Sequence, residues 1–318
     1  MATLSNKIVQ MNGFLFIDKG KGCTSFDVIR ALKKKLRVSF PGLKKNFKIG
    51  HCGTLDPIGT GLMIIALGEA SKLLEFLLGA DKVYRAECEF GAVSDTYDAD
   101  GKVEKMAEAK PVLVDEIKKI VQRDFDGKIS QLPPKFSAKK IGGKRACDLA
   151  REGKEVKLKP KEVEIYDFSF VSFEWPKMEF EVSCGSGTYV RSLVHDLGQS
   201  LGVGAYMTAL RRLEIGFFDG GVNRGFSVDD ALTVDEIDFE DESKGFLHTV
   251  EEVFAEYPSI ELNENDFRRL SNGGFVLNTK SVQGGEVLAK CRGKVVGVLK
   301  AMGDKKFVKF RKQIKIAA

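Results

Sequence analysis

A glycine-rich run at residues 50–61, GHCGTLDPIGTG, is the part of the sequence best suited to chemistry. It holds one carboxylate, Asp56, among four glycines and close to His51. Because glycine relaxes backbone sterics, such a loop can bend sharply or let another molecule approach closely. A carboxylate held there can act as a nucleophile or as a base. The structural alternative is that Asp56, which precedes Pro57, caps a helix.

The elements that must position this loop are predicted from hydrophobic spacing. Residues 62–78 indicate a strand that leads into a helix across Gly68. Alternating or continuous apolar residues predict strands at 14–17, 83–90, 178–184, 287–290 and 295–299. Helical spacing predicts helices at 25–36, with a serine cap, at 112–122 and in part of 192–213.

The distribution of charge favours a polyanionic partner. The chain has 318 residues and a net charge of only +5. However, residues 30–48 contain many lysines and arginines and no acid, and residues 135–161 are also strongly basic. Either run alone is typical of a solvated face, but two basic runs that flank a glycine-rich polar loop point to nucleic acid.

Several classes of protein and cofactor are disfavoured. No apolar stretch is long enough for a membrane span, and the first residues lack the plan of a signal peptide, so we expect a cytoplasmic protein without a membrane partner. The six cysteines contain no C-x-x-C pair, and the acidic residues at 95–100 do not fit a calcium loop, so we expect no metal. Residues 185–191 match neither a dinucleotide fingerprint nor a P-loop, which disfavours a nucleotide cofactor.

Six segments, in this order and spacing, resemble the TruB-type tRNA pseudouridine synthases, which isomerise a uridine in the T loop of tRNA. The agreement extends from about residue 13 to residue 216 and is weaker from about residue 258 onward. Small departures include Gly20, where the family usually has proline. The segments are residues 50–61 with Asp56, Tyr84-Arg85, residues 95–101, QLPPKFSAKK at 131–140, residues 187–192 and residues 210–213.

The resemblance implies an α+β fold. We expect a pseudouridine synthase core with a mixed, largely antiparallel sheet flanked by helices and loops, and a small β-rich PUA-like domain at the C-terminus. The expected boundaries are 1–250 for the catalytic domain and 251–318 for the RNA-binding domain. The implied activity is isomerisation of uridine-55 in the T stem-loop of tRNA by a monomer that uses no cofactor.

The resemblance also assigns the catalytic residues. Asp56 is the implied catalytic carboxylate, either as nucleophile or as base at the ribose. Arg191 is implied beside it, where a guanidinium lowers the pKa of the carboxyl and keeps it ionised. Tyr84 is implied to stack on the extruded base and to handle the proton lost from C5, and Tyr189 to line the pocket.

Five further residues are implied to contact substrate or RNA. His51 matches the family histidine that enters the T loop, and Lys19 is expected to brace the active-site loop. Lys140 is expected to touch a phosphate, which would make binding sensitive to salt. Leu210 and Asp98 complete the implied set.

Two other functions fit part of the sequence. A non-catalytic tRNA-binding or RNA-folding protein would explain the basic segments, but binding alone does not need Asp56 beside a polyanion. A carboxylate-dependent hydrolase of nucleosides or sugars would need a second well-placed carboxylate. Among related synthases, QLPPKFSAKK resembles the stand-alone type more than the type that works in a guide-RNA particle.

Overall fold

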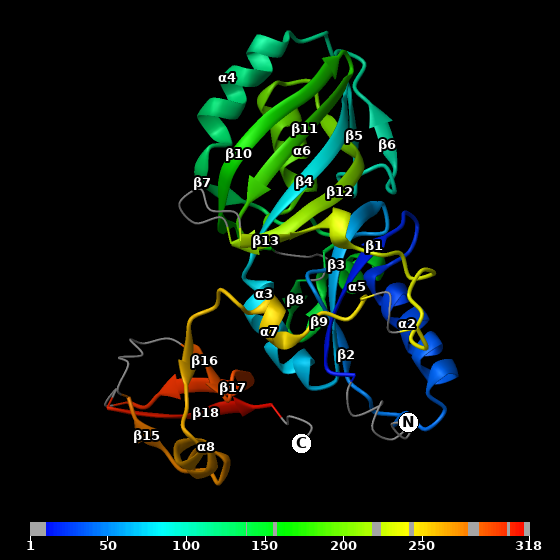
Figure 1. Ribbon diagram of the computed structural model, residues 1–318. Helices are drawn as coiled ribbons and strands as arrows, with labels where there is room; N and C mark the ends of the chain where they lie inside the picture. The colour runs from blue at the N-terminus through cyan, green and yellow to red at the C-terminus, as the bar shows by residue number, and fades with distance from the viewer. Residues whose placement is uncertain are drawn as a thin grey trace.

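Two β-sheets, one large and one small, organise the chain (Figure 1). The computed structural model describes residues 11–137, 139–154, 158–217, 224–241, 245–278, 286–303 and 306–314. Within these ranges the large sheet has nine strands: β1 (Gly13–Lys19), β2 (Ile49–Cys52), β3 (Gly59–Leu67), β4 (Asp81–Phe90), β7 (Gly127–Gln131), β10 (Lys161–Glu174), β11 (Lys177–Cys184), β12 (Ala205–Phe217) and β13 (Arg224–Ser227).

The strand order of the large sheet is β1-β3-β12-β4-β11-β10-β7, with β13 paired to β12 and β2 paired to β3. Strand β12 therefore lies between β3 and β4, and it runs parallel to β3. The other strand pairs described in this sheet are antiparallel. The prediction of a mixed, largely antiparallel sheet is confirmed.

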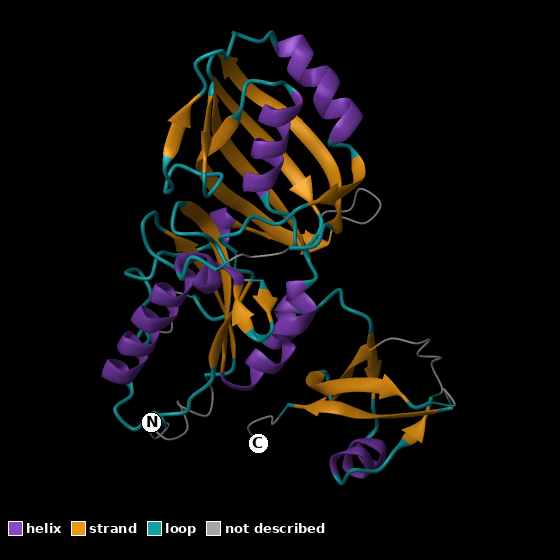
Figure 2. Ribbon diagram, turned by 180° about the vertical axis from the view of Figure 1, so that it is seen from behind, coloured by secondary structure: helices purple, strands orange, loops and turns teal. Residues whose placement is uncertain are grey.

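Helices cover one face of the large sheet. Figure 2 shows α4 (Val114–Asp124) and α6 (Val190–Ser200) lying across it. Apolar side chains of α6, including Leu193 and Leu197, pack into the same core as Phe180 of β11. The remaining elements are α2 (Ser25–Ser39), η1 (Gly68–Leu73), α3 (Leu74–Leu78), β5 (Ala92–Ser94), β6 (Val103–Lys105), β8 (Lys140–Ile141), β9 (Lys144–Arg145), α5 (Ala146–Arg151), η3 (Val228–Asp230), α7 (Val250–Val253) and α8 (Glu264–Ser271).

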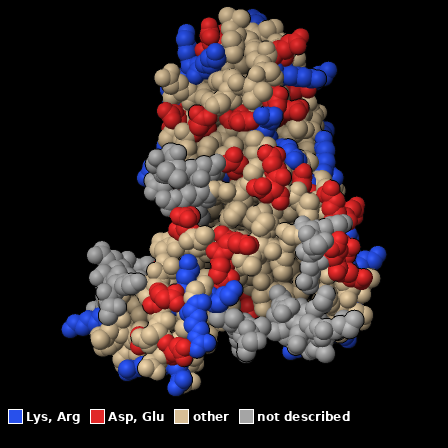
Figure 3. Space-filling view, in the orientation of Figure 1, with Lys and Arg blue, Asp and Glu red and all other residues tan. Residues whose placement is uncertain are grey.

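The two faces of the sheet differ in polarity because side chains alternate along each strand. On β4, Lys82 and Tyr84 point inward, whereas Glu87 points to the outer face. On β11, Glu179 and Glu181 also lie on the outer face, paired across from β4. Figure 3 shows acidic side chains spread over this side of the molecule. The outer face is thus unsuited to a polyanion.

The small sheet forms a β half-barrel near the C-terminus and docks on α3. Its order is β14-β16-β17-β18-β15. Lys312 and Arg311 both pair with Glu75 of α3, the former at 2.7 Å. The Tyr257 hydroxyl donates to the carbonyl of Phe76 at 3.0 Å. The strands are β14 (Ser259–Glu261), β15 (Val276–Leu277), β16 (Glu286–Cys291), β17 (Lys294–Ala301) and β18 (Phe307–Gln313).

One local prediction is wrong. The first helix is capped by Thr24, whose side chain accepts from the backbone of Asp27, and not by a serine. The prediction that the stretch 192–213 is helical in part is confirmed: α6 ends at Ser200, and β12 begins at Ala205. Gly202 and Gly204 intervene with φ of 72° and 68°, and such left-handed backbone ends a helix. None of the helices in the described ranges has the length and apolarity needed to cross a bilayer.

Candidate active site

The loop that carries Asp56 connects β2 to β3, and hydrogen bonds from Lys19 and Ser25 hold it in place. The Lys19 ammonium, 1% exposed, donates to the carbonyls of Gly20 at 2.9 Å and Gly59 at 2.5 Å. The Ser25 hydroxyl donates to the Leu55 carbonyl at 3.0 Å and accepts from the Leu55 backbone at 2.8 Å. The chain enters β3 directly after this loop, so Asp56 does not cap a helix.

Asp56 is bound by a buried guanidinium. Arg191 lies in the first turn of α6 and is 4% exposed. Its Nη2 lies 2.9 Å from Asp56 Oδ2, and its Nη1 lies 3.1 Å from Asp98 Oδ2. The same side chain donates to the carbonyls of Thr96 at 3.0 Å and Phe136 at 3.1 Å. With four acceptors around it, the guanidinium is fixed in the plane that orients Asp56.

The Asp56 side chain borders a pocket of about 460 Å³. Five residues that the sequence predicts for the site meet in its lining: Asp56, Tyr84, Tyr189, Arg191 and Leu210. Four basic residues join them, namely Lys82, Lys139, Lys161 and Arg212. The pocket thus combines one partly exposed carboxylate, two aromatic rings and an excess of positive charge, which suits a nucleotide drawn from a polyanion.

The electrostatics of Asp56 only partly match the expectation from sequence. Burial raises the pKa of Asp56 above its ordinary value, and Arg191 opposes this rise. Asp98 raises the pKa further through charge repulsion. Arg191 therefore lowers the pKa of Asp56, as predicted, but loss of hydration has the larger effect and the net direction is upward.

Both tyrosines are less acidic than in water. Burial raises the pKa of Tyr84, and the nearby Arg212 guanidinium opposes that effect. Burial also raises the pKa of Tyr189. Each phenol is therefore in its neutral form at pH 7, and each ring presents an apolar face to a base.

Asp98, Lys19 and His51 are predicted site residues that are not among those lining the pocket. Asp98 reaches the site only through Arg191, and Lys19 lies behind the loop. His51 is on β2, five positions before Asp56 in the chain; its Nδ1 is buried and has no hydrogen-bond partner among the residues that the structure describes, and burial lowers its pKa. Lys140 belongs to β8, and its side chain falls outside the described part of the structure.

Two residues at the site, Gln131 and Arg212, were not predicted from the sequence to act there. Gln131 makes two hydrogen bonds to the backbone of Tyr189: its Nε2 donates to the Tyr189 carbonyl at 3.1 Å, and its Oε1 accepts from the Tyr189 amide at 2.8 Å. Arg212 is 1% exposed and lines the pocket. The available signals were QLPPKFSAKK, where Gln131 received no role, and the pair Arg211-Arg212, of which a strand turns only one member inward.

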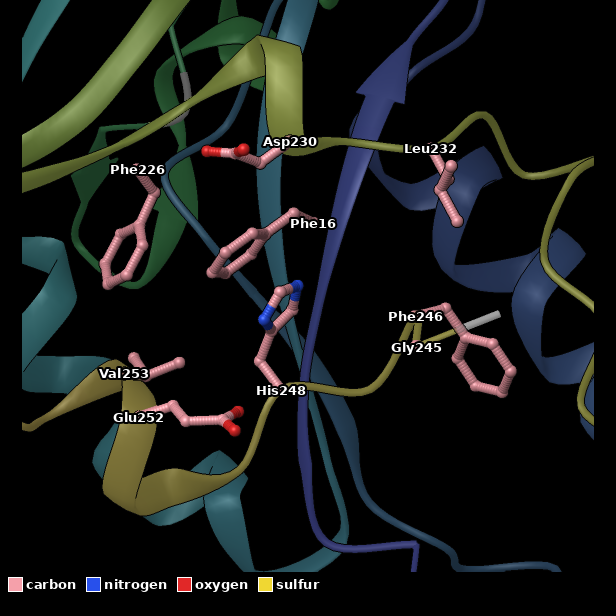
Figure 4. Close-up of a pocket in the computed structure, with 9 residues that line it drawn as sticks. All are labelled: Phe16, Phe226, Asp230, Leu232, Gly245, Phe246, His248, Glu252 and Val253. Atoms are coloured by element: carbon pink, nitrogen blue, oxygen red, sulfur yellow. The ribbon is translucent and has the colours of Figure 1, made fainter. Parts of the chain in front are cut away.

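A second cavity, of about 350 Å³, does not fit a polyanion. Figure 4 shows the His248 ring against Phe16, with Glu252 and Asp230 nearby. The His248 and Phe16 rings are stacked with their centroids 4.0 Å apart. The lining of this cavity contains two carboxylates and neither lysine nor arginine. Of the two, the pocket at Asp56 is the candidate active site, because its lining is basic and can bind a polyanion.

Comparison with known proteins shows the family of the chain. The model of the TruB family pseudouridylate synthase N-terminal domain matches residues 33–190, and that of the tRNA pseudouridylate synthase B C-terminal domain matches residues 191–254. The tRNA pseudouridine synthase B of Clostridium tetani is 38% identical, over 83% of this chain and 85% of that protein. The enzyme of Aquifex aeolicus is 39% identical, over 84% and 88%.

The fold is shared with proteins of more distant sequence. A chain in the crystal structure of a Cbf5-Nop10-Gar1 complex superimposes with a TM-score of 0.71 at 23% identity, covering 99% of this chain and 88% of that one. This similarity concerns the fold alone. On the family models and the relatives with higher identity, this chain belongs to the TruB family of tRNA pseudouridine synthases and is an isomerase.

Proposed function

We propose that the protein converts uridine-55 in the T loop of tRNA to pseudouridine, with Asp56 as the catalytic carboxylate and no cofactor. The observation that carries the proposal is the 2.9 Å ion pair between Asp56 and Arg191 at the wall of a pocket lined by two tyrosines. An isomerisation neither gains nor loses electrons, so the reaction itself needs no redox partner.

Asp56 can act in either of two mechanisms, as a nucleophile or as a base. It can attack C1′ of the ribose, or it can remove the proton from C2′; in both courses the N1–C1′ bond breaks and its electron pair stays on the uracil. The uracil then turns and C5 bonds to C1′; in the first course the bond from Asp56 to C1′ breaks, and in the second course C2′ regains its proton. The C5 proton then leaves, and N1 takes up a proton. Both courses begin with an ionised Asp56, which the Arg191 guanidinium favours.

The surrounding side chains would hold the extruded nucleotide. Tyr84 and Tyr189 offer ring faces for stacking, and Leu210 supplies an apolar contact on the wall. Lys139 and Lys161 also border the pocket, where ammonium groups can meet phosphates. Since the outer face of the sheet is acidic, we infer that tRNA approaches from the opposite side.

The remaining features are proposed from the same family pattern. His51 would fill the space that the base leaves in the T loop, while Lys19 holds the loop and Lys140 binds a phosphate. We further propose a cytoplasmic monomer with a catalytic domain at 1–250 and an RNA-binding domain at 251–318. The boundary falls inside α7, whose residues pack beside Phe14 and other residues of the large sheet.

The test is tritium release from unmodified tRNA labelled at uracil C5. We expect release by the wild type and none by Asp56→Asn, which keeps the size of the side chain, while tRNA affinity stays within about tenfold because phosphate contacts dominate binding. Asp18→Asn is a matched control, because Asp18 pairs with Arg211 away from the pocket.

Position is tested with a T stem-loop in which the target uridine is replaced by cytidine. Release from the uridine stem-loop alone would support position 55. Tight binding without release by the wild type would instead support a non-catalytic RNA-binding protein.

A further inference from the structure

Arg212 is a buried cation at the centre of the active-site sheet. It lies on β12, directly across from Gly61 on β3 and from Tyr84 on β4. Its Nε donates to the Leu62 carbonyl at 2.7 Å, and its Nη2 donates to the Gly53 carbonyl at 3.2 Å. The side chain therefore touches the turn that leads to Asp56 while it borders the same pocket as Tyr84.

The charge of Arg212 is not neutralised by a carboxylate in the described part of the chain. Its hydrogen bonds go to the Leu62 and Gly53 carbonyl oxygens and to the neutral hydroxyl of Tyr84, whereas Arg191 pairs with Asp56 and Asp98. Lys82, also buried in the lining, likewise donates to carbonyls, and burial lowers its pKa. Since a guanidinium does not deprotonate in proteins, Arg212 leaves a permanent positive charge beside Tyr84.

A buried cation without a carboxylate partner is costly to the free protein, but it can stabilise an anion that forms beside it during the reaction. The proposed reaction supplies one. When the N1–C1′ bond breaks, its electron pair moves to the uracil, which becomes an anion with charge shared among N1, O2 and O4. The electron deficit that this leaves at C1′ lies next to the carboxylate of Asp56. The charge on uracil is lost when C5 donates a pair to C1′; C5 then releases its proton and N1 takes one up, so the product is neutral.

We propose that Arg212 stabilises the uracil anion that forms on cleavage of the glycosidic bond. This rests on the proposed function, because it requires the uracil to be in the pocket beside Tyr84. Arg191 is committed to two carboxylates, so the two arginines have separate roles. Arg191 holds the carboxylate of Asp56, and Arg212 stabilises the departing uracil.

The test compares tRNA carrying uridine at the target position with tRNA carrying 5-fluorouridine there. Fluorine withdraws electrons, so the fluorinated uracil is the more stable anion and needs less help from a cation. The rate of loss of the target nucleoside is measured under single-turnover conditions at saturating enzyme, after nuclease digestion and mass spectrometry. The useful quantity is the ratio of the fluorouridine rate to the uridine rate, because any misfolded fraction cancels from it.

We expect Arg212→Gln to slow the uridine reaction about 100-fold and to raise the ratio about fivefold or more. Arg211→Gln is the matched control: it is the neighbouring residue, it pairs with Asp18 instead, and its ratio should equal that of wild type. Arg212→Lys keeps the charge and should keep the wild-type ratio although its rate falls. It also carries the test if the glutamine variant does not fold.

An unchanged ratio in Arg212→Gln, with both rates reduced equally, would overturn the proposal and leave Arg212 as a support for the Gly53 turn. A raised ratio in Arg212→Lys would overturn it as well. Failure of the proposed function gives a different result, because the wild type would then consume neither substrate.

Discussion

Replacing Arg191 by methionine should lower the free energy of unfolding by about 3–5 kcal/mol at pH 7. The substitution keeps a long apolar stem but removes the cation that joins Asp56 and Asp98. Asp98 accounts for most of the loss, because its side chain is only 4% exposed and cannot recover water. Asp56, at 34%, can be partly rehydrated.

A second substitution isolates the part of the stability loss that comes from Asp98. Asp98 keeps hydrogen bonds from the Thr96 hydroxyl at 2.6 Å and the Asp100 amide at 3.1 Å after Arg191 is lost. Asp98→Asn in the methionine background removes the stranded charge, so we expect it to restore stability there while it destabilises the wild type. A double-mutant cycle gives the coupling between Arg191 and Asp98 directly.

The assay is urea unfolding at pH 7 and at lower pH, with Arg211→Met as control. Arg211 pairs with Asp18 but is 40% exposed, so its loss should cost about 1 kcal/mol or less. Without Arg191, the pKa of Asp56 rises further above its unfolded value. The folded variant then binds protons more tightly than the unfolded chain, so the stability gap to wild type narrows as pH falls. Equal losses at Arg191 and Arg211, or a gap independent of pH, would refute the reasoning.

Two further predictions follow from the site. Because burial raises the pKa of Asp56 and the ionised form is the active one, the single-turnover rate should fall on acidification with an apparent pKa above the ordinary 3.8; a fall only below that value would contradict the assigned electrostatics. Gly61→Ala should lower the free energy of unfolding by about 1–3 kcal/mol, because Gly61 has a φ of 100° and a Cβ there would lie 2.2 Å from the Arg212 carbonyl oxygen. Gly79→Ala has open space and should change it by about 1 kcal/mol or less, and equal thermal denaturation curves for the two variants would contradict the steric argument.

The strands around the site were predictable because their signals are local. Residues 83–90 alternate between buried and exposed positions, and β4 matches them closely. The stretch 192–213 was predicted to be helical only in part, and the structure places the change from helix to strand at Gly202 and Gly204. The glycines were visible in the sequence, but their positive φ follows from packing.

The contents of the site divide in the same way. Asp56, Tyr84 and Arg191 were identified by the family pattern, and the pocket does contain all three. The part played by Arg212 depends on strand pairing, since only the neighbours across β3 and β4 decide that it faces Tyr84 and Gly53. A pair of adjacent arginines in a sequence does not indicate which one is buried. The net direction of the Asp56 pKa also required the degree of burial.

The position of β12 links completion of the fold to completion of the site. Strands β3 and β4 follow each other in sequence, yet β12 separates them in the sheet. The bond from Arg212 to the Leu62 carbonyl spans 150 residues, so it forms only when this late strand inserts. Insertion also brings Leu210 and Arg212 to the pocket, while α6, which directly precedes β12, carries Arg191 to Asp56. Because closing such a long loop is entropically costly, we infer that the sheet and the active site form in one late step.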